Sequence, residues 1–171
     1  MVVCETQRLI IRELTKCDAE FIYRLMNSAG WLKHIGDRNI DSIETAATYI
    51  EESFRKAYQD NNFGFWAVID KITNQALGIN GLIKRNELEH VDIGFAFLPE
   101  FMGHGFAYES SVAILAYGKL VLDIDPIIAI TSKNNHSSQK LLTKLGMQNT
   151  RIEFIKEEWG ESMVFEFPLS A

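Results

Sequence analysis

The sequence predicts a single mixed α/β (α+β) domain over residues 1–171, in which antiparallel strands lead into a β-α-β-α-β half. Three observations support this fold class. Apolar residues recur with the helical period of 3.6 after Asp41, and they alternate with small or polar residues at 90–98. A turn with glycines at 103 and 105 then separates this strand from a second helical segment.

The first elements are a strand at residues 8–14 and a helix beginning at Thr15, where Asp18 stands three residues on, as in a capping box. Asp41 and Glu44 begin the clearest helix of the chain, with an apolar face kept for four turns. No repeat or linker interrupts the order of elements, which predicts one continuous domain.

Strands follow at residues 64–70, 76–84 and 90–98, and short turns between them predict an antiparallel meander. In the third strand Gly94 and Ala96 leave one face nearly bare. A bare face beside an apolar one leaves room for a ligand. The remaining expected elements are a helix to about residue 120, a strand at 127–131, a helix from 136 that ends before Gly146, and strands at 147–155 and 161–168.

Composition and charge exclude several classes of protein. Hydrophobic residues make up 47% and charged residues 23% of the chain, as in an ordinary globular protein, and no apolar run reaches the roughly 18 residues that cross a bilayer. We therefore expect no membrane partner, and a cytoplasmic location because the N-terminus has no signal-peptide pattern. The net charge of -6 argues against a nucleic-acid partner and suits a cationic one. Cys4 and Cys17 predict neither a disulfide nor a metal site.

The glycine turn has the features of an anion site. The first turn of a helix has unpaired N–H groups, and Gly103 and Gly105 let a phosphate approach them without meeting a Cβ. The alternative is that the glycines only form the turn. An NAD site is disfavoured, because Tyr108 stands where a third glycine is needed and the preceding strand belongs to a meander.

Together with this turn, the segment TSKNNHSSQKLLTKLGM at 131–147 resembles the acyl-coenzyme A signature of the GNAT superfamily of N-acetyltransferases. The family pattern Gln/Arg-x-x-Gly-x-Gly/Ala corresponds to MGHGFA at 102–107, where Met102 replaces the usual Gln or Arg, and Asn-x-x-Ser before an apolar helix ending in Gly corresponds to Asn135, Ser138 and Gly146. ETQRLIIREL and FGFWAVID also follow the family's order, so the resemblance covers nearly the whole chain, which looks like the ribosomal-protein (Rim-type) branch.

The resemblance implies a mixed, mostly antiparallel central sheet with helices on both faces, and acetyl-CoA as cosubstrate. It implies that the pantetheine arm lies along the strand at 90–98 and that the pyrophosphate rests on the glycine turn. Asn135 would hold the arm or cap its helix. Lys133, Lys140 and Lys144 are candidates for the 3'-phosphate or are solvated partners of the helix dipole. The expected cofactor-binding residues are Phe95, Ala96, Phe97, Met102, Gly103, His104, Gly105, Phe106, Ala107, Asn135 and Ser138.

The implied reaction is acetyl transfer to a primary amine, a small amine or a protein N-terminus, by direct attack in a ternary complex. Asp92 is the candidate general base because it shares the small-residue face with Gly94; the alternative is a solvated strand carboxylate. Leu142 stands where many members have a catalytic Tyr, which makes Ser138 the nearest candidate hydroxyl for the leaving thiolate. The same departure leaves open a non-catalytic acyl-CoA-binding sensor or partner-binding module.

The acceptor is expected to contact the segment at 30–39, between the first two helices, because it appears irregular and has an aromatic residue and a histidine. Trp31 and His34 are the candidate substrate-binding residues; the alternative is a packed connector. Trp159 and Gly160 lie in a hairpin turn that is expected to close over the acceptor. We expect a monomer or a homodimer.

Overall fold

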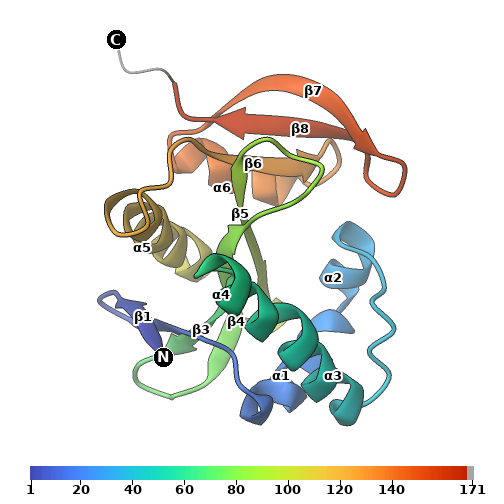
Figure 1. The fold of residues 1–171 in the computed structure, drawn as a ribbon, viewed down its shortest axis with the longest axis vertical. Helices are drawn as coiled ribbons and strands as arrows, with labels where there is room; N and C mark the ends of the chain where they lie inside the picture. Colours follow the sequence, from blue (N-terminus) through green and yellow to red (C-terminus); the bar gives the residue numbers. More distant parts are fainter. Residues whose placement is uncertain (169–171) are drawn as a thin grey trace.

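The computed structural model describes residues 1–168 and is built on an eight-stranded sheet (Figure 1). The order across the sheet is β1-β2-β3-β4-β5-β6-β8-β7, and β5 and β6 form the one parallel pair between the strands of the described chain. The strands are β1 (Val2–Glu5), β2 (Leu9–Arg12), β3 (Phe65–Asp70), β4 (Ala76–Ile83), β5 (Val91–Phe97), β6 (Ile127–Ser132), β7 (Gln148–Lys156) and β8 (Gly160–Glu166). The expected mixed, mostly antiparallel sheet is confirmed.

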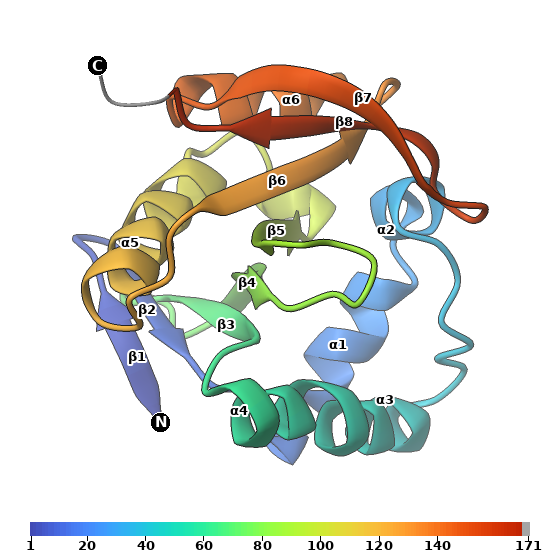
Figure 2. The ribbon, with the colours of Figure 1, turned by 45° about the horizontal axis from the view of Figure 1, so that its top comes forward.

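Helices cover both faces of this sheet, as the turned view in Figure 2 makes clear. On one face, Ile114 and Leu142 from two C-terminal helices join a core with the large side chains of β4 and β5. On the other face, Ile22 and Ala46 belong to a second core formed by the N-terminal helices. The helices are α1 (Ala19–Met26), α2 (Ala29–His34), α3 (Ile43–Tyr49), α4 (Lys56–Asn61), α5 (Phe106–Leu120) and α6 (His136–Lys144), with 3-10 turns η1 (Lys16–Asp18) and η3 (Pro99–Phe101).

The long helix predicted after Asp41 is present but is not uniform. Between α3 and α4 the chain forms a π-helical segment, η2 (Ile50–Arg55), so the helix runs on to Asn61 with a wider turn in its middle. Ser42 caps its start, because its hydroxyl accepts a hydrogen bond from the N–H of Thr45 at 3.1 Å. Wide turns of this kind are rare and frequently occur at functional sites.

Two local expectations need correction. The segment at 30–39 is not wholly irregular, because α2 occupies its first half, and Ser28 caps this helix by accepting from the N–H of Trp31. Six residues are too few to show a helical period, and Gly30 obscures the pattern further. The strand expected at 8–14 is also preceded by β1, which pairs with it across a short turn.

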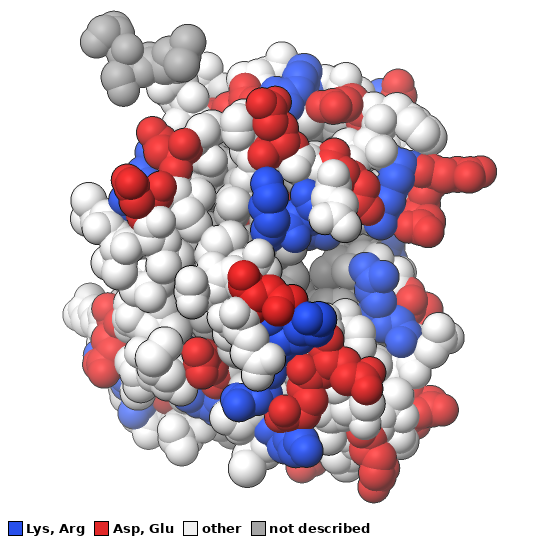
Figure 3. Space-filling model, in the orientation of Figure 1, with Lys and Arg blue, Asp and Glu red and all other residues white. Residues whose placement is uncertain are grey.

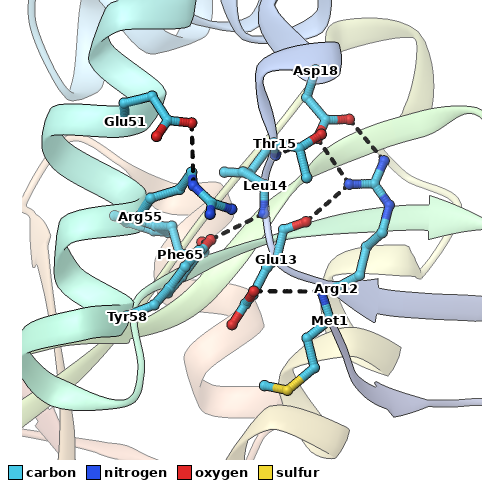
Figure 4. A network of polar contacts seen from close by, with 10 residues as sticks. All are labelled: Met1, Arg12, Glu13, Leu14, Thr15, Asp18, Glu51, Arg55, Tyr58 and Phe65. Carbon is cyan, nitrogen blue, oxygen red and sulfur yellow. Dashed lines mark hydrogen bonds and ion pairs between the residues drawn. The ribbon is translucent and has the colours of Figure 1, made fainter.

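A polar network fixes the junction between the N-terminal strands and the α4–β3 connection (Figure 4). The guanidinium of Arg12 donates to both oxygens of Asp18 at 2.7 and 2.8 Å, and the N–H of Thr15 donates to the same carboxylate at 2.8 Å. The hydroxyl of Tyr58 accepts from the N–H of Leu14 at 3.2 Å and donates to the carbonyl of Phe65. The start of β3 is thereby held at a defined position beside the site.

Candidate active site

β5 and β6 pair only where both strands begin. Val91 aligns with Ile127 and Asp92 with Ile128, after which β6 continues against β8 while β5 stays paired with β4. Among residues 1–168, no strand pairs with the outer edge of Phe95–Phe97. An exposed strand edge is a template for an extended ligand, which can add to it with sheet-like hydrogen bonds. The backbone of Phe95, Ala96 and Phe97 therefore has an unpaired edge on the side of β6.

The glycine turn follows β5 directly and ends at the first residue of α5. Gly103 and Gly105 have left-handed backbone conformations, with φ of 78° and 81°, and no side chain caps the helix. A Cβ on Gly103 would meet no atom within 4 Å. The structure gives no protein acceptor within the described chain for the N–H groups from Gly103 to Ala107, whereas the N–H of Met102 donates to Pro99 at 3.3 Å. The turn thus presents free donors at the positive end of a helix dipole.

Arg8, which directly precedes β2, braces this turn, a contact that the sequence did not indicate. Its guanidinium donates to the carbonyl of His104 at 3.1 Å and to the carboxylate of Glu109 at 2.7 Å, and lies 4.5 Å from the ring centre of Phe106. Burial raises the pKa of Glu109, but hydrogen bonds from Thr6 and Arg8 outweigh this effect and lower it overall. The turn is therefore fixed before any ligand arrives.

Asn135 and Ser138 lie at the start of α6, which follows β6 on the other side of the opening. The side-chain oxygen of Asn135 accepts from the N–H of Ser138 at 3.2 Å, so the capping alternative is realised in the structure. Its amide nitrogen is not needed for that cap. Leu142, one turn after Ser138, is 1% exposed and belongs to the apolar core. The position of the usual Tyr is thus occupied by a core residue.

Asp92 lies at the last position where β5 pairs with β6, beyond which the two parallel strands separate. It is 1% exposed, and one carboxylate oxygen accepts from Nε of Arg85 at 2.8 Å. Burial raises the pKa of Asp92, and the charge and hydrogen bond of Arg85 oppose that rise. The alternative of a solvated strand carboxylate does not fit this burial.

Next to Asp92 on the same face of β5 is Gly94, which allows close approach of neighbouring side chains. A Cβ there would lie 2.9 Å from Ile83 and 3.1 Å from Phe65. Ile83 and Phe65 in turn line a cavity of about 220 Å³ between α2, the α3–α4 helix and the end of β4, which we call the α2–β4 pocket. Its other lining residues are Trp31, Ile35, Arg38, Tyr49, Ser53, Phe54, Ala57, Asn61, Phe63, Gly64, Leu82, Lys84 and Arg85.

The two predicted substrate residues differ in their relation to this pocket. Trp31 lines it and is 5% exposed, and its indole nitrogen is buried without a hydrogen-bond partner in the described chain. His34 is exposed and does not line it; partial burial and the charge of Lys33 lower its pKa. Arg85 lines the pocket and binds Asp92, so the pocket and the strand opening share one ion pair.

Trp159 connects the C-terminal hairpin to the same region. The guanidinium of Arg85 lies 5.0 Å from the centre of its indole ring, and the ammonium of Lys156 lies 4.0 Å from it. The sequence indicated the hairpin and the segment 30–39 that contains Arg38, but not Arg85 or Lys84. A signal was present in the run Lys84-Arg85 directly after a buried strand, where loops carry binding residues.

The lysines considered for a phosphate have different surroundings. Lys133 pairs with Glu161 at 2.5 Å, and the ammonium of Lys144 lies 4.4 Å from the ring centre of Tyr108. Lys140 and His136 line a surface depression of about 360 Å³ on α6. Of the three lysines, Lys140 is the one that lines this depression.

Two further findings concern what residues 1–168 contain. No group of three or more His, Cys, Asp or Glu side chains in this part of the chain is arranged to hold a metal ion. None of the helices in it combines the length and the apolar character that crossing a bilayer requires.

Comparisons with known proteins agree with this architecture. Residues 8–148 match the model of the acetyltransferase (GNAT) domain. The chain is 31% identical over 147 residues to the uncharacterized N-acetyltransferase YoaA of Bacillus subtilis (strain 168), covering 85% of this chain and 82% of YoaA. The GNAT-family acetyltransferase from Bacillus anthracis has a TM-score of 0.78 at 22% identity, with 95% of this chain and 96% of that chain covered. The ribosomal-protein-S5-alanine acetyltransferase from Vibrio fischeri has a TM-score of 0.78 at 17% identity, with 95% and 94% covered.

Proposed function

Because this chain belongs to the GNAT acetyltransferase family and is an N-acetyltransferase, we propose that it moves the acetyl group of acetyl-CoA to a primary amine by direct attack in a ternary complex. The observation that carries the proposal is the free edge of β5, which begins beside Asp92 and leads into the uncapped glycine turn. A strand edge and a helix N-terminus in succession suit an arm with amide groups that ends in a pyrophosphate.

The residues of β5 and the turn divide the binding of acetyl-CoA between them. The pantetheine arm bonds to those backbone groups of Phe95, Ala96 and Phe97 that face away from β4. The pyrophosphate is bound by the backbone N–H groups of Gly103, His104, Gly105, Phe106 and Ala107. Met102 contributes its side chain, which is 54% exposed, because its N–H is already engaged. Asn135 offers its amide nitrogen to the arm, and Lys140 meets the 3'-phosphate.

Asp92 accepts the proton that the acceptor ammonium must lose before its nitrogen attacks the thioester carbonyl. The new N–C bond replaces the C–S bond, and the departing thiolate takes the second proton, which the nitrogen loses as the amide forms. Ser138 is the hydroxyl proposed to stabilise that thiolate, since Leu142 is part of the core. Both reactants are held where β5 and β6 separate, and this supplies the orientation that the step requires.

The acceptor is a small primary amine or a protein N-terminus, and the α2–β4 pocket with Trp31 is its proposed binding site. His34, exposed at the end of α2, would contact only an acceptor that extends out of the pocket. Membership of the Rim-type branch would favour the protein N-terminus, as the name of the Vibrio fischeri enzyme illustrates. A cytoplasmic location and a monomeric or homodimeric state complete the proposal.

A calorimetric titration of the purified protein with acetyl-CoA, with NAD and ATP as controls, tests the cofactor site. We expect saturable binding of acetyl-CoA alone. An assay of CoA release with a panel of amines then tests the enzyme against a non-catalytic acyl-CoA sensor. Absence of acetyl-CoA binding would refute the proposed function, and binding without turnover on any amine would favour the sensor.

A further inference from the structure

The charged residues of the α2–β4 pocket share one sign. Arg38, Lys84 and Arg85 line it, and no Asp or Glu is among its lining residues in the described chain. Figure 3 shows a hollow in the surface between the positions of α2, α4 and the β4–β5 loop in Figure 1, with Lys and Arg atoms on its sides. The chain as a whole has a net charge of -6, so this local excess of positive charge runs against the average of the molecule.

The three cations differ in how far their charge is compensated. Arg85 is paired with Asp92 at 2.8 Å. Arg38 and Lys84 have no carboxylate partner within residues 1–168, and the ammonium of Lys84 donates only to the backbone carbonyl of Glu89 at 3.2 Å. Two uncompensated charges therefore remain at the pocket for a ligand.

A neutral hydrogen-bond donor, the indole of Trp31, also belongs to the lining of the pocket. The indole nitrogen of Trp31 is buried with no acceptor in the described structure, although buried N–H groups are normally paired. Trp31 lines the same pocket. A ligand that supplies oxygen acceptors pairs with the two cations, whereas a protonated polyamine, which has donors only, pairs with neither.

We propose that the acceptor amine carries a carboxylate or phosphate group. Arg38 and Lys84 bind this group in the α2–β4 pocket, while the amine reaches the point beside Asp92 where β5 and β6 separate. This inference rests on the proposed acetyl transfer and specifies its substrate class. At about 220 Å³ the pocket is smaller than the roughly 300–1,000 Å³ of sites for drug-sized ligands, which suits an acceptor of amino-acid size.

The test compares matched amines that differ only in the anionic group. CoA release is measured with 4-aminobutyrate against 4-aminobutanamide, with O-phosphoethanolamine against ethanolamine, and with spermidine as a polycation. In at least one pair we expect kcat/KM to be about tenfold or more higher for the anionic member, the scale of a hydrogen bond to a charged group. The two pairs distinguish a carboxylate from a phosphate.

Variants connect the preference to the pocket. Arg38→Gln and Lys84→Gln should each raise KM for the anionic amine about tenfold with little change in kcat, and leave KM for the neutral partner unchanged. Lys33→Gln is the matched control, because Lys33 is an exposed cation on α2 that does not line the pocket. Calorimetry of 4-aminobutyrate and O-phosphoethanolamine with the same proteins gives a readout that needs no turnover.

The outcomes separate this inference from the function on which it rests. The proposed anionic acceptor would be overturned, with acetyl transfer unaffected, if the enzyme preferred the neutral amines or spermidine. It would also be overturned if the preference for anionic amines persisted in both variants. No binding or acetylation of any anionic member would also overturn it. Failure to bind acetyl-CoA would count against the proposed function, and the calorimetric comparison would still decide whether the pocket binds anions.

Discussion

Nε of Arg85 donates to a carboxylate oxygen of Asp92 at 2.8 Å, and Asp92 is 1% exposed at the point where β5 and β6 separate. A buried carboxylate without a cation would hold its proton well above the ordinary range, whereas a paired one remains able to ionise. The ion pair therefore keeps a buried group available as a proton acceptor, and it connects the strand opening to the α2–β4 pocket.

Replacing the carboxylate removes the proposed base. We expect Asp92→Asn to lower kcat about tenfold or more, on the scale of general-base catalysis, while acetyl-CoA affinity stays within about twofold. Steady-state rates across pH, with calorimetry on the same protein, measure both quantities. Near-wild-type turnover at every pH would exclude Asp92 as the base.

The pH profile should respond to Arg85 with a defined sign. The base works when ionised, so kcat rises with pH through the pKa of Asp92. Burial raises that pKa and Arg85 lowers it, so Arg85→Gln removes the lowering effect and should move the rising limb to higher pH. Lys156→Gln is a control, because Lys156 contacts the same indole of Trp159 but is not a partner of Asp92. If the rising limb does not move, it does not report the ionisation of Asp92.

Gly103 should matter for the cofactor more than for the fold. A methyl group there meets no protein atom within 4 Å, but it stands at the uncapped turn in a left-handed backbone conformation with φ of 78°. We expect Gly103→Ala to weaken acetyl-CoA binding about tenfold or more. Gly160→Ala imposes similar backbone strain at φ of 59°, also with no atom within 4 Å. Calorimetry should show unchanged affinity for this control, and equal losses in both variants would contradict a phosphate site at the turn.

Asn135 allows capping and ligand binding to be separated by chemistry. Asn135→Asp keeps an oxygen for the N–H of Ser138 and loses the amide donor, whereas Asn135→Ala loses both. The Ala variant should lower the free energy of unfolding by about 1 kcal/mol, and the Asp variant should not. If the amide nitrogen holds the pantetheine arm, both should raise Kd for acetyl-CoA. Unchanged affinity of the Asp variant would leave Asn135 as a cap only.

Much of the fold is local in its causes, which is why the sequence predicts it. The alternation along β5, the glycine turn before α5 and the cap of α6 each depend on neighbouring residues. The opening beside β5 is different, because it exists only once β6, about thirty residues later, pairs at one end and departs toward β8. The resemblance to the GNAT family implied this opening, whereas the hydrophobic periodicity of the sequence alone does not predict it.

The acceptor side was the least predictable part. The α2–β4 pocket joins residues from α2, from η2 and from the end of β4, which lie far apart in the chain. The expectation of a cationic acceptor used the net charge, which says nothing about the sign of one pocket. An aromatic residue near a histidine pointed to Trp31, but only the structure shows that its indole nitrogen is buried without a hydrogen-bond partner among residues 1–168.

The pair of Arg12 and Asp18 makes the stability of the domain depend on pH. Both oxygens of the carboxylate accept from the guanidinium, and the side chain of Asp18 is 7% exposed. Burial raises the pKa of Asp18, but hydrogen bonds from Arg12 and Thr15 outweigh it, and the pKa in the folded protein lies below its ordinary value of 3.8. A lowered pKa means that the ionised form stabilises the fold above the unfolded-state pKa, and that this contribution is lost as pH falls through the folded-state pKa.

We therefore expect Asp18→Asn to lower the free energy of unfolding by roughly 1.5–3 kcal/mol at neutral pH, the range for hydrogen bonds to charged groups. The difference from wild type should shrink below about pH 4, where the carboxylate is protonated first in the unfolded chain, and it should vanish once pH falls below the lowered pKa of the folded protein. Urea denaturation at several pH values measures this. Asp60→Asn is the control, because Asp60 pairs with Lys56 at the surface with side chains 52% and 63% exposed, and such pairs contribute about 0.5 kcal/mol or less. A constant difference across pH would show that Asp18 acts through packing or capping rather than through its charge.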